Sequence, residues 1–190
     1  MPDTPSSAPA TRILFVCMAN ICRSPMAEAV ARSVAEAQGI ARSYTFDSAG
    51  TIANFAGQAP DDRARRVAAG RGYSMSGIKA RTIALRDFEK FDLILAMDRK
   101  ILLSLQRICP EVHQSKIRLF LDYVPDETGD DVPDPYYGNL AGFEHVLDLC
   151  ERAAQTLLPH TSQNDSLSDE ANTQGGFLSR IREFLARHRH

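Results

Sequence analysis

A cysteine and an arginine six residues apart form the pattern in this chain that is richest in chemistry. Cys17 follows an apolar run at 13–16, and Arg23 precedes a Ser24-Pro25 pair that opens a predicted helix. In a loop between a strand and a helix start, backbone N–H groups can converge on one anion and favour the thiolate of a cysteine. Arginine can hold two phosphate oxygens at once. The pattern favours a thiol that attacks a bound tetrahedral oxyanion, although Cys17 alone would also suit a small buried residue at a strand end.

A carboxylate further along the chain is a candidate proton donor. Breaking a phosphate ester requires a proton for the leaving alkoxide or phenoxide. Asp134 suits this role because Pro133 and Pro135 stiffen the backbone on both sides of it. Spacing alone leaves the choice open, since the same region holds Asp122, Asp126, Glu127, Asp130 and Asp131.

The elements that would position these residues alternate between strands and helices. Short apolar runs predict strands at 12–16, 44–49, 91–97 and 116–121. Helical patterns cover 25–38, 61–71, 98–107 and 140–158. We expect Ser24 to cap the first helix and Pro25 to be its first residue. The alternation predicts an α/β fold with a parallel sheet covered on both faces, whose ligands bind beyond the carboxyl ends of the strands.

Composition is typical of an ordinary globular protein. The 190 residues are 44% hydrophobic and 24% charged, with a net charge of -2 that gives no indication of nucleic-acid binding. No run reaches the roughly 18 apolar residues of a membrane span, and residues 1–10 lack the apolar core of a secretory signal. The four cysteines fit neither a zinc site nor a disulfide framework, so we expect free thiols in the cytoplasm, with non-classical secretion left open.

The chain divides by composition into four parts. We expect a flexible lead at 1–10, a catalytic domain at 11–159, a polar linker at 160–176 and a short basic amphipathic segment at 177–190. That last segment would dock on its own domain, on a partner or on a membrane surface.

Four ordered motifs resemble those of the low-molecular-weight protein tyrosine phosphatase family. They are Cys-Met-Ala-Asn-Ile-Cys-Arg-Ser-Pro at 17–25, Asp-Ser-Ala-Gly-Thr at 47–51, Ala-Met-Asp-Arg at 96–99 and Asp-Pro-Tyr-Tyr-Gly at 134–138. The resemblance covers about residues 11–158. It implies a four-stranded parallel sheet flanked by helices on both faces, a three-layer Rossmann-like fold with the phosphate-binding loop after the first strand. It also implies hydrolysis of phosphotyrosine esters through a cysteinyl-phosphate intermediate.

The resemblance assigns roles to individual residues. Cys17 would be the nucleophile, Arg23 would bind the phosphate and stabilise the transition state, and Asp134 would act first as acid and then as base. Ser24 would donate a hydrogen bond to the sulfur of Cys17. No metal or organic cofactor is implied, and the partner would be a phosphotyrosine-containing protein.

The remaining implied residues bind substrate or support the loop. Asn20 and Ser48 would hold the loop in shape, and Cys22 would be a redox partner of Cys17, although it also suits a packed residue. The substrate-binding set comprises Met18, Ala19, Asn20, Ile21, Cys22, Ser24, Tyr136 and Tyr137.

Several positions depart from the family pattern, among them Ile101, which stands where the family often has asparagine. Ala19 stands where the family usually has glycine, so we expect strain there if the loop needs a left-handed backbone at that residue. Asn54 stands where many relatives carry an aromatic residue at the rim of the cleft, and Phe55 is the candidate to replace it.

Two other functions compete with this interpretation. An arsenate reductase shares the fold and loop but needs extra resolving thiols, and Cys109 and Cys150 are not closely spaced in the sequence. A non-catalytic module that binds phosphotyrosine or another anion is the second alternative. The presence of Cys17, Arg23 and Asp134 together favours the enzyme.

Overall fold

The computed structural model describes residues 10–158. Residues 1–9 of the predicted lead at 1–10, the predicted linker at 160–176 and the basic segment at 177–190 lie outside the described residues.

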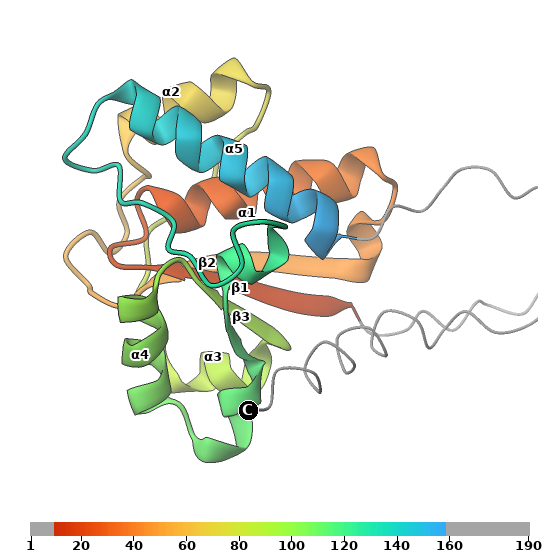
Figure 1. The fold of residues 1–190 in the computed structure, drawn as a ribbon, viewed down its shortest axis with the longest axis vertical. Coiled ribbons are helices and arrows are strands. Elements are labelled where there is room, and N and C mark those ends of the chain that lie inside the picture. The colour runs from red at the N-terminus through yellow and green to blue at the C-terminus, as the bar shows by residue number, and fades with distance from the viewer. Residues whose placement is uncertain (1–9, 159–190) are drawn as a thin grey trace, which may run out of the picture. The chain divides into compact units, whose positions relative to one another are not determined.

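The core of the fold is a four-stranded sheet in the order β2-β1-β3-β4, with all pairs parallel (Figure 1). Its strands are β1 (Thr11–Cys17), β2 (Tyr44–Gly50), β3 (Leu93–Ala96) and β4 (Ile117–Leu119). The predicted fold class, a parallel sheet with helices on both faces, is confirmed.

The central strand β1 serves two cores at once. Ile13 and Phe15 point into one apolar cluster, whereas Leu14 and Val16 point into the other. All four side chains are fully buried, because successive residues of a strand face opposite sides of the sheet.

Within residues 10–158, five α-helices pack in layers on the two sides of the sheet (Figure 1). One face packs against α1 (Arg23–Ala37) and α5 (Leu140–Leu157), and α2 (Asp62–Gly70) packs on α5. The other face packs against α3 (Leu85–Lys90) and α4 (Arg99–Ile108). Within the described range, none of these helices is long and apolar enough to cross a bilayer.

The differences from the expected elements are local. The sequence did not predict α3, whose six residues are too few to show a helical period. Its first turn closes because the Asp87 carboxylate accepts a hydrogen bond from the Ala84 N–H at 2.8 Å. Both β3 and β4 are shorter than expected, and β4 ends at Leu119 because the chain then turns into a 3₁₀ helix. The 3₁₀ helices are η1 (Ala41–Ser43), η2 (Glu111–Lys116) and η3 (Phe120–Tyr123).

The topology places the loop after β1 at a natural binding position. The chain pairs β2 on one side of β1 and then crosses to pair β3 on the other. In parallel sheets, ligands bind beyond the carboxyl ends of the strands at such a reversal. Cys17, the last residue of β1, lies at this point.

Gly50 lets the loop after β1 lie directly against the end of β2. A Cβ at Gly50 would lie 2.7 Å from the carbonyl oxygen of Met18 and 2.9 Å from the carbonyl carbon of Ala19. Backbone hydrogen bonds from Thr51 and Ile52 then continue the contact beyond the strand. A residue without a side chain is therefore required here.

Candidate active site

The loop after β1 curls around the sulfur of Cys17, and Asn20 fixes its shape. Asn20 is fully buried and has a left-handed backbone with φ of +57°. Its N–H donates to the Cys17 Sγ at 3.3 Å, and its side-chain amide donates to the Ser24 Oγ at 2.9 Å. The Asn20 Oδ1 accepts from the Arg81 N–H at 2.9 Å. One side chain thus ties the loop to the helix that follows and to a distant segment.

The strain that we expected at Ala19 is absent. Within the described residues, Asn20 and Asp126 are the non-glycine residues with positive φ, and Ala19 is not among them. Asparagine tolerates the left-handed region better than other side chains. The unusual backbone therefore falls on a residue suited to it, and that expectation for Ala19 is wrong.

The expected capping role of Ser24 is also wrong. Helix α1 begins at Arg23 with Cys22 before it, and no side chain caps it, so Pro25 is its third residue. The Ser24 hydroxyl lies 3.0 Å from the Cys17 Sγ instead, within hydrogen-bond distance. Because the helix start has no side-chain cap, its N–H groups are available to an anion.

Arg23 is a buried cation held by two carboxylates. Its side chain is 5% exposed, and it pairs with Asp98 at 2.7 Å and with Asp134 at 2.9 Å. It also donates to the Val132 carbonyl at 3.1 Å. Sequence reasoning assigned no role to Asp98, although its position directly after β3 was a usable signal, because the carboxyl ends of β1 and β3 are adjacent.

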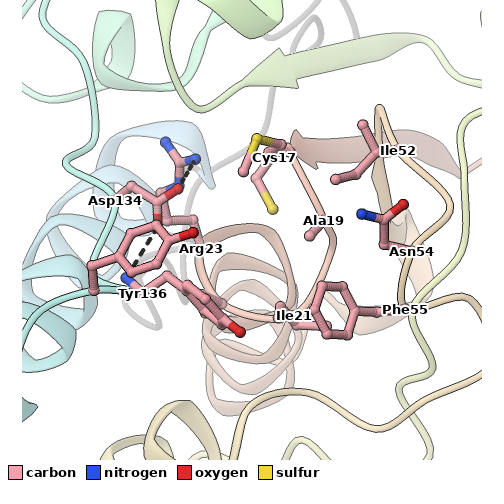
Figure 2. Close-up of a pocket in the computed structure, with 12 residues that line it drawn as sticks. Cys17, Ala19, Ile21, Arg23, Ile52, Asn54, Phe55, Asp134 and Tyr136 are labelled. Atoms are coloured by element: carbon pink, nitrogen blue, oxygen red, sulfur yellow. Dashed lines mark hydrogen bonds and ion pairs between the residues drawn. The ribbon is translucent and has the colours of Figure 1, made fainter.

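A cleft of about 220 Å³ opens over Cys17. Figure 2 shows Asp134 and Tyr136 on one side of it and Asn54 and Phe55 on the other. The Phe55 and Tyr136 rings lie 6.5 Å apart, and the Asp134 side chain remains 39% exposed. This size suits one side chain carrying a phosphate better than a large ligand.

The structure brings most of the predicted site residues together around this cleft. Its predicted lining residues are Cys17, Met18, Ala19, Ile21, Cys22, Arg23, Asp134, Tyr136 and Tyr137, and sequence reasoning did not assign Ile52 to it. Asn54 and Phe55 also line it, so an aromatic ring is present at the rim. Asn20 and Ser24 are buried and contact Cys17 directly.

Ser48 does not line the cleft. Its buried hydroxyl donates to the carboxylate of Glu28 on α1, so its direct contact is with the helix. Burial raises the pKa of Glu28, while the hydrogen bond from Ser48 and the charge of Arg32 oppose that shift. Ser48 thus helps fasten β2 to α1.

Cys22 is a buried thiol of low reactivity. Burial raises its pKa, and the negative charge of Asp61 adds to the shift. The thiol therefore stays protonated at neutral pH, and a protonated thiol is a poor nucleophile. The Cys17 sulfur, in contrast, accepts a hydrogen bond from the Asn20 N–H and lies within hydrogen-bond distance of the Ser24 hydroxyl.

An ion-pair network behind the loop was not predicted. Arg81 pairs with Asp47 at 3.0 Å and with Asp87 at 2.8 Å, and its backbone N–H holds Asn20. Asp47 belongs to one of the four motifs, but its partner Arg81 lies 34 residues further along the chain, so the sequence did not reveal the pair. Within residues 10–158, no group of three His, Cys, Asp or Glu side chains is arranged to hold a metal ion.

Together, the fold and the site define a class of enzyme. An anion-binding loop at the reversal point of a parallel sheet carries a thiol, a guanidinium and a carboxylate in one cleft. Such an arrangement serves reactions in which a cysteine attacks a tetrahedral oxyanion.

Comparison with known proteins narrows this class to one family. Residues 12–171 match the low molecular weight phosphotyrosine protein phosphatase family. The low molecular weight protein-tyrosine-phosphatase of Streptomyces coelicolor is 43% identical over 150 residues, 77% of this chain and 91% of that protein. The low molecular weight phosphotyrosine protein phosphatase of Homo sapiens is 40% identical over 148 residues, 77% of this chain and 92% of its own.

A solved structure agrees with these sequence relatives. The crystal structure of a protein tyrosine phosphatase from Entamoeba histolytica superposes with a TM-score of 0.75 at 41% identity, covering 78% of this chain and 94% of that one. The chain belongs to the low molecular weight phosphotyrosine protein phosphatase family, and it is a hydrolase of that class.

Replacing Asn20 tests whether this residue holds the loop in shape. We expect Asn20→Ala to lower the free energy of unfolding by about 1–3 kcal/mol, because two hydrogen bonds are lost and alanine must adopt a left-handed backbone. We also expect kcat/KM to fall about 10-fold or more as the loop shifts. Denaturant unfolding and steady-state kinetics measure the two effects.

Asn139→Ala is the matched control, because the Asn139 side chain makes no capping hydrogen bond at the start of α5. Its effect on stability should stay within about 0.5 kcal/mol. Equal effects of the two substitutions would contradict the role given to Asn20. Ala19→Gly should bring no gain in stability, since Ala19 has no positive φ to relieve.

Proposed function

We propose that this chain hydrolyses phosphotyrosine in proteins through a phosphocysteine intermediate. The observation that carries the proposal is the meeting of the Cys17 sulfur, the Arg23 guanidinium and the Asp134 carboxylate in one cleft with aromatic walls. The relatives' shared name supports the same substrate class.

In the first step, the Cys17 thiolate attacks phosphorus. An S–P bond forms as the bond from phosphorus to the tyrosyl oxygen breaks, and Asp134 gives its proton to that oxygen. The N–H groups of the loop and Arg23 stabilise the negative charge on the equatorial oxygens in the transition state. Tyrosine leaves as a neutral phenol.

In the second step, water cleaves the intermediate. Asp134, now a carboxylate, takes a proton from the water, whose oxygen attacks phosphorus as the S–P bond breaks. The Ser24 hydroxyl, 3.0 Å from the sulfur, stabilises the departing thiolate. Inorganic phosphate is released, and Asp134 is again protonated.

Substrate binding itself prepares Asp134 for the first step. One nitrogen of Arg23 pairs with Asp134, whereas Asp98 holds the other. A phosphate that takes over the first nitrogen replaces Asp134 as the partner of Arg23. The Asp134 carboxyl is then released to meet the leaving oxygen.

The walls of the cleft favour an aryl substrate. Tyr136 and Phe55 face the space above Cys17, and aromatic pairs of this kind prefer edge-to-face or offset contact. Tyr137 is 95% exposed, so it is free to contact the protein that carries the phosphotyrosine. A phosphoserine side chain is shorter than that of phosphotyrosine and has no ring to contact Phe55 and Tyr136.

The arrangement of the other thiols disfavours arsenate reduction. Cys109 packs in the core beside α3 and α4, whereas Cys150 packs in the core on the opposite face of the sheet. Neither thiol lines the cleft, so neither can relay a disulfide from Cys17. A module that only binds phosphotyrosine or another anion needs no proton donor. The Asp134 carboxyl beside Arg23 therefore favours an enzyme.

We also propose where the protein acts in the cell and how the chain divides into domains. All four cysteines are free, which suits a reducing cytoplasm. We place the catalytic unit at 11–159, with the linker at 160–176 and the basic segment at 177–190 outside it.

Cys17→Ser tests the nucleophile. We expect the wild-type chain to hydrolyse p-nitrophenyl phosphate without added metal and Cys17→Ser to lose at least about 10³-fold in kcat. Binding of inorganic phosphate, measured by calorimetry, should persist, because the loop N–H groups remain. Cys109→Ser is the control, and equal activity of wild type and Cys17→Ser would overturn the proposal.

Asp134→Asn tests the proton donor. Phenyl phosphate has a poor leaving group, so its kcat/KM should fall about 10²-fold or more. For p-nitrophenyl phosphate, whose leaving group needs little protonation, the fall should be much smaller. An equal fall on both substrates would mean that another group supplies the proton.

We propose that Cys22, although its thiol is protonated and slow to react, resolves an oxidised Cys17 because both residues line the same cleft. Peroxide converts the Cys17 thiolate to a sulfenic acid, which condenses with the Cys22 thiol to give a disulfide and water. After brief peroxide treatment, dithiothreitol should restore activity to the wild type but not to Cys22→Ser. Full recovery of that variant would contradict this role.

A further inference from the structure

Arg63 lies outside the four motifs, yet it contacts both sides of the site. It is the second residue of α2, and its side chain is about one-third exposed. Its guanidinium makes two hydrogen bonds to the Asp61 carboxylate, at 3.0 and 2.8 Å. A two-point pair of this kind fixes the plane of the guanidinium as well as its position.

The partner of Arg63 is fastened to the phosphate-binding loop. The Asp61 N–H donates to the carbonyl of Ile21 at 2.9 Å, and Ile21 lines the cleft. The Asp61 carboxylate also caps α2 by accepting from the Arg63 N–H at 2.8 Å. The side-chain hydrogen bonds from Arg63 lower the pKa of Asp61, against the opposing effect of burial. Arg63 is therefore held in a fixed place relative to the loop.

The free edge of the guanidinium faces the segment that carries the acid. Arg63 donates to the Gly138 carbonyl at 3.3 Å, at the end of the segment that starts with Asp134. Its Cζ lies 5.6 Å from the centre of the Tyr136 ring and 4.7 Å from that of Phe143 on α5. Contacts between a cation and a ring at these distances are attractive.

The segment between Val132 and Gly138 is therefore held at both ends. At its start, the Val132 N–H donates to Met97 at 2.8 Å and its carbonyl accepts from Arg23. At its end, Arg63 holds Gly138 and the Tyr136 ring. Two prolines stiffen the part between, so a shift at either end displaces the Asp134 carboxyl.

We propose that Arg63 is a positioning residue that sets where Asp134 and Tyr136 stand over the phosphate-binding loop. The inference rests on the proposed function, because it concerns the delivery of a proton to the leaving phenol. Arg63 itself touches neither the phosphate nor the leaving oxygen.

The test compares leaving groups rather than rates alone. The readout is kcat/KM for p-nitrophenyl phosphate divided by kcat/KM for phenyl phosphate. Damage to the loop or to folding lowers both values and leaves the ratio unchanged, whereas a misplaced acid raises the ratio. We expect Arg63→Ala to raise it by at least about tenfold, since an error of about 1 Å in position can cost about 10²-fold.

Two further variants sharpen the comparison. Arg63→Lys keeps a charge near the rings but loses the two-point pair, so its ratio should fall between wild type and Arg63→Ala. This milder variant gives the same readout if Arg63→Ala fails to fold. Arg65→Ala, an exposed arginine on the same helix that pairs with Asp62, should keep the wild-type ratio.

A double variant distinguishes misplacement of the Asp134 carboxyl from a general loss of activity. With Asp134→Asn already present, Arg63→Ala should raise the ratio no further, because there is no acid left to misplace. A wild-type ratio in both Arg63 variants, or an undiminished rise in the double variant, overturns the inference. A wild-type chain that hydrolyses neither substrate would overturn the proposed function instead.

Discussion

The site depends on one buried asparagine with a left-handed backbone. Asn20 bends the loop so that its own N–H points at the Cys17 sulfur, and its side chain holds Ser24 on one side and the Arg81 backbone on the other. A buried amide of this kind must satisfy its polar atoms, and here each has a partner. The bend also requires Gly50, because the loop lies where a Cβ would otherwise be. The shape of the anion site is therefore built before any ligand binds.

Arg23 holds separate segments of the chain together around the site. It starts α1, yet its ion pairs reach Asp98 at the end of β3 and Asp134 in the segment before α5. Taking a charge out of water is costly unless it is paired, and two carboxylates with a carbonyl satisfy this guanidinium. The same ion pairs hold the phosphate-binding loop, which carries Cys17 and Arg23, in a fixed position relative to the segment that carries Asp134. In the proposed mechanism, phosphate exchanges places with one of these carboxylates.

Residue types and their order were enough to predict the fold class and the reacting groups. Cys17 and Arg23 could be identified because one ends a predicted strand and the other precedes a predicted helix, whereas Asp134 was distinguished from its acidic neighbours only by the resemblance of its motif. The left-handed Asn20 could not, since neighbouring residues alone do not show which one takes positive φ. Ser24 followed no capping rule because its hydroxyl oxygen accepts a hydrogen bond from Asn20 and lies within hydrogen-bond distance of Cys17. The partners Asp98 and Arg63 depend on tertiary contacts, and α3 was too short to leave a pattern.

Trapping the covalent intermediate tests the central claim most directly, which is that the phosphoryl group is transferred to Cys17. The chain would be mixed with p-nitrophenyl phosphate, quenched within milliseconds, and analysed by mass spectrometry with fragmentation of the segment that holds both Cys17 and Cys22. We expect the added mass of one phosphoryl group on Cys17, with more of it in a variant whose second step is slowed. A phosphoryl group on Cys22, or turnover with no phosphocysteine at any quench time, would contradict the account.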